Sequence, residues 1–144
     1  MAASNNKATL QNMQTKLAAM GGVKAAVIGE PRQVQSGTVA IILESGDIDE
    51  TTLQHPREVH RVTLRRFENW MEAPPEEIEF RLDEWRAEIM ADVFGEFDLG
   101  GTVAYALPME CSWTYGYQTV NNTIYRLLDI EIAYRVDDRA AFAA

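Results

Sequence analysis

The chain has 144 residues, 47% of them hydrophobic, which suits one domain that buries about two-thirds of its unfolded surface. Its 13 basic and 22 acidic residues give a net charge of -9, which opposes wrapping by nucleic acid and adsorption to an anionic membrane. A single cysteine excludes a disulfide framework within one chain, and no segment is apolar enough for a signal peptide or a membrane span. We expect one cytoplasmically made domain over residues 1–144, with loose ends at about 1–6 and 137–144.

The first half of the chain predicts one helix and three strands. Apolar residues at three- and four-residue spacing predict an amphipathic helix that ends at Gly21 and Gly22. These residues are Leu10, Met13, Leu17 and Met20. Apolar runs at 23–28 and 38–43 predict the first two strands, and an acidic segment with a Ser45-Gly46 turn predicts an exposed loop over 44–52. The third strand is expected over 58–67, but its apolar residues occur on both parities, so the buried face stays open.

A second helix is expected after Pro74 and Pro75, because prolines followed by acids are typical of a first helical turn. Its apolar residues recur at helical spacing over about 20 residues. They are Ile78, Leu82, Trp85, Ile89 and Val93. We expect this stripe to lie across a sheet.

The segment 102–136 predicts a long antiparallel hairpin. From Val103 to Tyr117 every odd position is apolar or aromatic, and alternation resumes with changed parity after a polar turn at 118–122. The second run places apolar side chains at Leu128, Ile130, Ile132, Tyr134 and Val136. Pro108 cannot donate to a ladder, so the first strand should break or lie at an edge nearby. Its aromatic residues most simply pack in the core, the alternative being a platform that stacks a sugar or a base.

Together these elements predict an α+β domain. We expect a mixed, mainly antiparallel sheet of about five strands with two helices packed on it, in the order α-β-β-β-α-β-β.

The search for catalytic chemistry finds no phosphate-binding glycine loop, nucleophile elbow or paired-cysteine metal spacing. His55 and His60 are five residues apart, a spacing that fits neither one helix face nor one strand face. Cys111 lies on the apolar parity of its strand, which predicts a small buried hydrophobe and not a nucleophile. We therefore expect no enzyme activity, no cofactor and no metal.

Two charged sets remain. Ten of the 13 basic residues are arginine, and Arg57, Arg61 and Arg65 share one strand parity. Arginine is favoured at protein interfaces because its planar fork binds carboxylates with two hydrogen bonds. This row is either a contact between subunits or a solvated strand face. The densest set of acids without neighbouring bases is Glu44, Asp47, Asp49 and Glu50.

The chain resembles the tail terminator proteins of long-tailed bacteriophages. The resemblance rests on the element order, the acidic connection at 44–52, the arginine-containing strand at 57–67, the helix opened by Pro-Pro-Glu-Glu and the final strand at 129–136. Those proteins cap a finished tail tube and join it to the head. The resemblance implies a homomeric ring, expected to be a hexamer, that contacts the tail tube protein on one side and a head-completion or neck protein on the other. It also implies a channel for DNA without specific binding, no catalysis, and a place in the virion after assembly in the host cytoplasm.

Within such a ring, the acids at 44–50 are expected to line part of the channel, because carboxylates repel DNA phosphates and keep the path slippery. The arginine row is expected at the subunit interface. Two alternatives stay open. Other phage neck, tail-completion or tube subunits share the size and composition, and a small-molecule-binding or enzymatic α+β domain could use the aromatic hairpin as a pocket wall.

Overall fold

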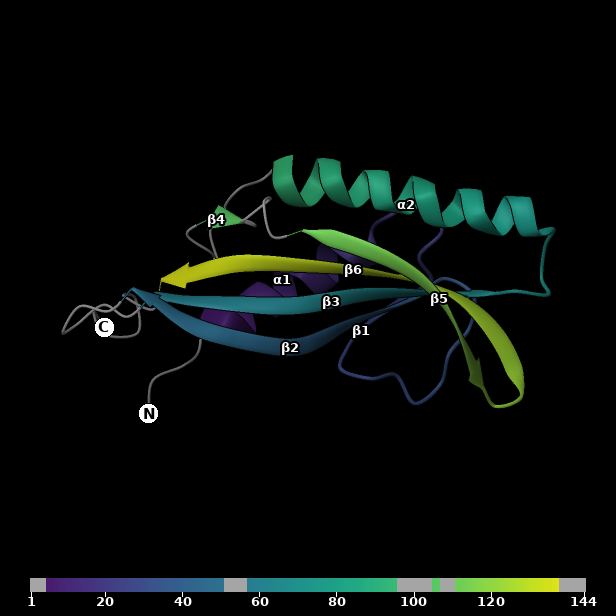
Figure 1. Ribbon diagram of the computed structural model, residues 1–144, viewed down its shortest axis with the longest axis horizontal. Coiled ribbons are helices and arrows are strands. Elements are labelled where there is room, and N and C mark those ends of the chain that lie inside the picture. Colours follow the sequence, from purple (N-terminus) through teal and green to yellow (C-terminus); the bar gives the residue numbers. More distant parts are fainter. Residues whose placement is uncertain (1–4, 51–56, 96–104, 107–110, 138–144) are drawn as a thin grey trace.

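The computed structural model describes residues 5–50, 57–95, 105–106 and 111–137 (Figure 1). Its elements in chain order are α1 (Asn5–Ala18), β1 (Ala25–Ile28), β2 (Thr38–Glu50), β3 (Arg57–Asn69), α2 (Pro75–Gly95), β4 (Tyr105–Ala106), β5 (Ser112–Val120) and β6 (Thr123–Asp137). The predicted α+β fold and element order are confirmed. The first strand of the predicted hairpin is described in two parts, β4 and β5. Pro108 and the odd positions 103, 107 and 109 lie outside the described residues, so the break near Pro108 stays a prediction.

The sheet runs in the order β1-β2-β3-β6, and both β4 and β5 pair with the far side of β6. β1 is parallel to β2, and every other pair is antiparallel. β1 covers β2 only from Thr38 to Ile41, so nothing in the described residues pairs with the outer side of β2 beyond that point. β5 lies at the opposite edge of the same sheet (Figure 1).

The turn between β5 and β6 consists of Asn121 and Asn122, which have φ values of 49° and 66°. Positive φ at both central residues is the geometry of a type I′ turn, which matches the twist of the two strands that it joins. Asparagine tolerates this left-handed conformation better than most residues. The polar turn predicted over 118–122 is therefore confirmed for its last two residues, whereas residues 118–120 continue β5 because they pair with β6.

Both helices pack on one face of the sheet, which we call the helix-covered face. The core there contains Leu10, Met13, Leu17, Met20, Ile78, Leu82, Trp85 and Ile89 from the helices and their ends, with Val39, Ile41, Val62, Leu64, Leu128, Ile130, Ile132 and Tyr134 from the strands. All of these side chains are at most 8% exposed. The predicted stripes of both helices and of β6 are thus confirmed, apart from Val93 and Val136, whose side chains lie outside the described residues.

Neither described helix packs on the opposite face. At one end a small cluster of Ala40, Phe67, Tyr125 and Leu127 is buried. The Tyr125 hydroxyl donates a hydrogen bond to the carbonyl of Val34 at 2.9 Å, so the segment between β1 and β2 covers this end. The structure also settles the parity of β3: Val62 faces the helices and Phe67 faces the other way.

The predicted loop at 44–52 is wrong over its first seven residues, because β2 continues to Glu50. β3 is long enough to supply a ladder, with bulges between Leu43 and Ser45 and between Ile48 and Glu50 that absorb the irregular sequence. Gly46 permits this pairing, since a Cβ at that position would lie 3.0 Å from the carbonyl oxygen of Val59. The tertiary partner therefore overrides a local turn signal.

The predicted burial of the aromatic residues of β5 is also wrong. Trp113 is 43% exposed, Tyr115 38% and Tyr117 57%. Their parity was predicted correctly, because Trp113 lies opposite Ile130 on the helix-covered face. The strand is at the sheet edge, however, where coverage is incomplete. Neither described helix has the long apolar stretch that a bilayer crossing requires.

Candidate functional site

The helix-free side of β2, β3 and β6 carries the polar face, which consists of Glu44, Asp47, Arg61, Thr63, Arg65, Asp129 and Glu131. Strand register places these side chains on one side, because Arg61 lies opposite Ala133, Thr63 opposite Glu131, and Arg65 opposite Asp129. The sequence predicted two separate charged sets, one acidic and one basic. The structure brings their described members together on one surface.

The arginine row makes ion pairs within its own chain. Arg65 donates to Asp129 with two hydrogen bonds, Nε to Oδ1 at 2.7 Å and Nη2 to Oδ2 at 3.0 Å. This contact, opposed by burial, raises the pKa of the Arg65 guanidinium above its ordinary value. Arg61 donates to Asp47 at 2.6 Å. The side chain of Arg57 lies outside the described residues, and the contact of this row with a neighbouring subunit stays a prediction.

Glu44 and Asp47 of β2 are exposed, as expected, but they are not unpaired. Asp47 forms the ion pair with Arg61, and Glu44 accepts a hydrogen bond from the Thr63 hydroxyl at 2.9 Å. The side chains of Asp49 and Glu50 lie outside the described residues. The earlier expectation of a bare acidic patch is therefore wrong for Glu44 and Asp47, because strand pairing brings donors from β3 beside them. Their place in a channel wall stays a prediction.

The aromatic edge consists of Trp113, Tyr115 and Tyr117. The Arg86 guanidinium of α2 lies 4.7 Å from the ring centre of Trp113. Arg126 lies 4.5 Å from the ring of Tyr117 and 5.4 Å from that of Tyr115. These cation–π contacts order the rings without burying them.

Arg126 is held in place by α2. Its Nε donates to Oε1 of Glu79 at 2.8 Å, and its Nη1 donates to the carbonyl of Gly116 at 3.4 Å. The guanidinium therefore links the helix to the edge strand while stacking on the tyrosines. An ordered aromatic row at an exposed strand is a candidate contact surface.

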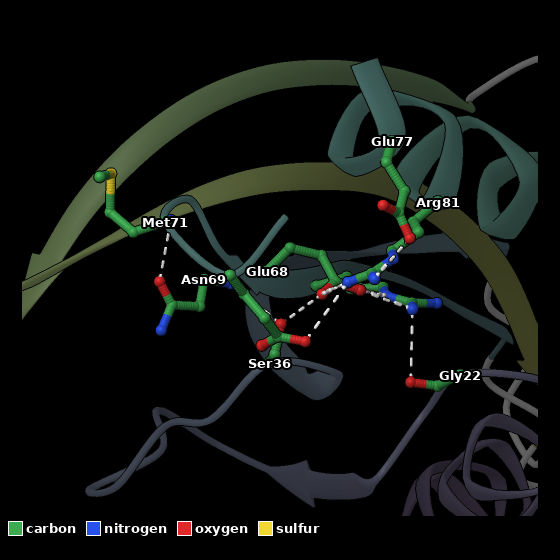
Figure 2. Close-up of polar contacts among 9 residues, drawn as sticks. Gly22, Ser36, Glu68, Asn69, Met71, Glu77 and Arg81 are labelled. Carbon is green, nitrogen blue, oxygen red and sulfur yellow. Dashed lines mark hydrogen bonds and ion pairs between the residues drawn. The ribbon is translucent and has the colours of Figure 1, made fainter. Parts of the chain in front are cut away.

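A buried ion-pair cluster lies where β3 ends beneath α2 (Figure 2). The side chains of Arg66 and Glu68 are only 4% and 3% exposed, and Arg66 Nη2 donates to Glu68 Oε1 at 2.7 Å. The other carboxylate oxygen accepts a hydrogen bond from the Ser36 hydroxyl at 2.5 Å and lies 3.7 Å from Arg81. The pair therefore ties β3 to the segment before β2 and to α2.

The turn that follows α1 also reaches this cluster, since Arg66 donates to the carbonyl of Gly22 at 3.3 Å. Gly22 has a φ of +79°, a backbone conformation that favours glycine, and a Cβ there would also press against Arg66 Nη2 at 2.8 Å. A pocket of about 430 Å³ opens beside the cluster, with Trp85 in its wall. Both oxygens of the Glu68 carboxylate accept hydrogen bonds, and the Ser36 hydroxyl donates to one of them while it accepts a hydrogen bond from the Asn69 N–H at 3.0 Å. These contacts join separate elements, so the cluster serves as a structural clasp.

Sequence reasoning did not single out Arg66 and Glu68. A signal was present, because both continue the parity of Val62 and Leu64 toward the helices. Charged residues on a buried parity require partners, and these partners come from segments distant in the chain.

Metal ligation finds no support in the described residues, where no group of three or more His, Cys, Asp or Glu side chains is suitably placed. His60 is hydrogen-bonded to Glu58 at 3.0 Å and stacks on Tyr134 with ring centres 5.7 Å apart. His55 lies outside the described residues. Cys111 is half-buried, with its sulfur 3.8 Å from that of Met90, and burial raises the pKa of its thiol.

No protein-family model matches the chain, and no curated protein does either. The function must therefore be argued from the residues and surfaces described above.

Proposed function

We propose that this protein is a structural subunit of a bacteriophage tail, which assembles into a ring that caps the tail tube, joins it to the head or neck, and lets DNA pass through a central channel. The proposal starts from the resemblance of the chain to tail terminator proteins. It assigns no catalytic role to any residue. The partners are other copies of the chain, the tail tube protein and a head-completion or neck protein.

The observation that carries the proposal is that apolar side chains are exposed at both lateral edges of one sheet. On the outer side of the sheet at β2, Leu43 is 56% exposed and Ile48 is 67% exposed. The aromatic edge on β5 lies at the other end of the strand order. A subunit in a cyclic assembly has two neighbours and needs two different contact surfaces, which this arrangement provides.

The polar face suits the wall of a DNA channel. A protein grips DNA by neutralising phosphates with free cations and releasing counterions. Here Arg61 and Arg65 are held by Asp47 and Asp129, so they are poorly placed to bind phosphates. The net charge of -9 adds a general repulsion.

The alternative of a small-molecule-binding domain with an aromatic pocket wall has less support. Trp113, Tyr115 and Tyr117 are absent from the linings of the pockets beside Arg66 and beside Arg61. They lie along an exposed strand, where a neighbouring protein surface is the more natural contact.

The assembly is tested with the purified chain by native mass spectrometry and negative-stain electron microscopy over a range of concentrations. We expect closed rings with a central hole. A particle that keeps the 16.2 kDa mass of one chain at every concentration, with no rings in the images, would reject the proposal.

The channel is tested with rings that carry Glu131→Lys, an exposed acid of the polar face that lies on β6 and not on either outer edge of the sheet. A matched control carries Glu76→Lys, the same change at an exposed acid on α2. We expect linear double-stranded DNA to stay bound to the first rings at higher salt than to the control rings, because new cations in the channel would contact phosphates. If both kinds of ring retain DNA equally, the polar face does not line the channel. This result would not contradict ring formation.

A further inference from the structure

We infer that the outer side of β5 in one subunit pairs with residues 42–48 of β2 in the next, antiparallel, so that the sheets of successive subunits join head to tail. This inference rests on the proposed ring function and names the contact that builds the ring. The occupant of each free edge is thus a second copy of this chain.

The first argument is the absence of protection along β5. Long edge strands normally carry charges, prolines or bulges that limit pairing with another chain, and β2 carries two bulges with the acids Glu44 and Asp47. β5 has nine residues, Ser-Trp-Thr-Tyr-Gly-Tyr-Gln-Thr-Val, with none of these features, and its register with β6 is unbroken. No described strand pairs with its outer side.

The second argument is strand direction. β2, β3, β6 and β5 are neighbours in that order, and each adjacent pair is antiparallel. β5 therefore runs opposite to β2. Two copies placed side by side in the same orientation bring β5 of one against β2 of the other in an antiparallel arrangement. Repeating this operation gives a heterologous assembly, which closes into a ring if the rotation closes.

The third argument is the match on the helix-covered face. Leu43 lies opposite Val62, and Trp113 lies opposite Ile130, so both are on the side where the helices pack. Ile48 shares this side through its partner Glu58, which has the parity of Val62. Joining the edges would place the exposed Leu43 and Ile48 beside the aromatic edge and remove both apolar surfaces from water.

The helix-free face matches as well. There β2 presents the carboxylates of Glu44 and Asp47, whereas β5 presents the hydroxyl and amide groups of Ser112, Thr114 and Gln118. Ser112 already donates to Glu131 at 3.4 Å on this face. Carboxylates would meet hydrogen-bond donors across the new contact, without a like-charge pair.

Pairing between two identical edges buries fewer of the exposed apolar side chains or brings like charges together. Two β5 strands could pair about a two-fold axis, but Leu43 and Ile48 would then stay exposed and the assembly would stop at a dimer. Two β2 edges would bring Glu44 and Asp47 close to the same residues of the partner, which is unfavourable for like charges. Among assemblies built from one repeated contact, only the pairing of β5 with β2 uses both edges of every subunit.

Cross-linking between single-cysteine variants tests the pairing directly. In a Cys111→Ser background, Ile48→Cys is mixed in turn with Trp113→Cys, Tyr115→Cys and Tyr117→Cys, and each mixture is oxidised. We expect disulfide-linked dimers from at least one mixture, because facing residues of paired strands fall within disulfide range. Dimers that form from the β5 variants alone, with none in the mixtures that contain the Ile48→Cys chain, would show two-fold β5 pairing and overturn the inference.

A charge placed on the edge gives a second readout. Tyr115→Lys introduces a charge into the proposed contact, and Phe80→Lys makes the same kind of change at an aromatic residue on α2 that is 58% exposed. We expect Tyr115→Lys to raise the protein concentration needed for half-maximal assembly by about tenfold or more, and Phe80→Lys to leave it unchanged.

The two proposals fail in different ways. Rings that form normally with Tyr115→Lys and give no cross-links would overturn the edge pairing and leave the ring function standing. Cross-links in open chains without rings would keep the pairing and reject the ring. A wild-type chain that neither assembles nor cross-links would reject both.

Discussion

Removing the buried carboxylate of Glu68 is expected to destabilise the fold strongly. In the native state Arg66 donates to it through Nη2 at 2.7 Å and Nε at 3.1 Å. Glu68→Ala leaves the guanidinium almost fully buried, with the carbonyl of Gly22 at 3.3 Å and the Trp85 ring centre at 5.7 Å as its remaining contacts in the described residues. Breaking a buried pair from one side typically costs about 3 to 5 kcal/mol, a large part of the 5 to 15 kcal/mol that stabilises a typical domain.

The assay is denaturation by urea, with the free energy of unfolding taken at constant slope. Glu77→Ala is the matched control, because Glu77 also pairs with Arg81 but is 54% exposed, and its loss should cost at most about 1 kcal/mol. The double variant Arg66→Met with Glu68→Leu should recover most of the stability, since both charges leave the interior together. A loss below about 1 kcal/mol for Glu68→Ala would refute the view that this pair is an essential clasp.

Three other outcomes follow from the same geometry. Trp85→Ala should cost about 3 to 5 kcal/mol in the free energy of unfolding, because Trp85 fills the core. Phe80→Ala should cost less than about 1 kcal/mol, because Phe80 is exposed. Similar losses for the two variants in chemical denaturation would contradict the packing of Trp85. Neutralising Arg61 and Arg65 with glutamine should leave ring assembly intact by light scattering if the polar face lines the channel, whereas a loss of rings from a folded monomer would place the row at the subunit interface. The thiol of Cys111 should react with iodoacetamide more slowly than a free thiol at pH 7, because burial raises its pKa and reduces the thiolate fraction. The reaction rate should rise only at more alkaline pH. A rate equal to that of a free thiol at pH 7 would show that Cys111 is not shielded.

The sequence alone determined which side of α1, α2 and β6 is apolar and faces the core. The stripes of α1 and α2 and the alternation of β6 were predicted correctly, because helical and strand periodicity report which side of an element is apolar. The turn at Asn121 and Asn122 was equally local, since positive φ is a property of the turn itself. The fold class followed from these signals.

Periodicity does not report how far an apolar side is covered. The side chains of β5 face the direction that their pattern indicates, yet Trp113, Tyr115 and Tyr117 remain exposed because the strand ends the sheet. In the same way, residues 44–50 carry loop signals but form strand, because β3 provides hydrogen-bonding partners along their length. Position within the sheet decided both outcomes.

The charged residues show the same division. Their shared parity placed Arg61 and Arg65 on one side of β3, as the pattern indicated. Their partners were beyond the reach of the sequence, because Asp129 is 64 residues from Arg65 and pairs with it only through the register of β3 with β6. The burial of Arg66 and Glu68 likewise depends on α2 and the segment before β2 closing over them. Local periodicity fixes the direction of a side chain, whereas burial, ion pairing and the free edges depend on which distant segments come to lie beside it.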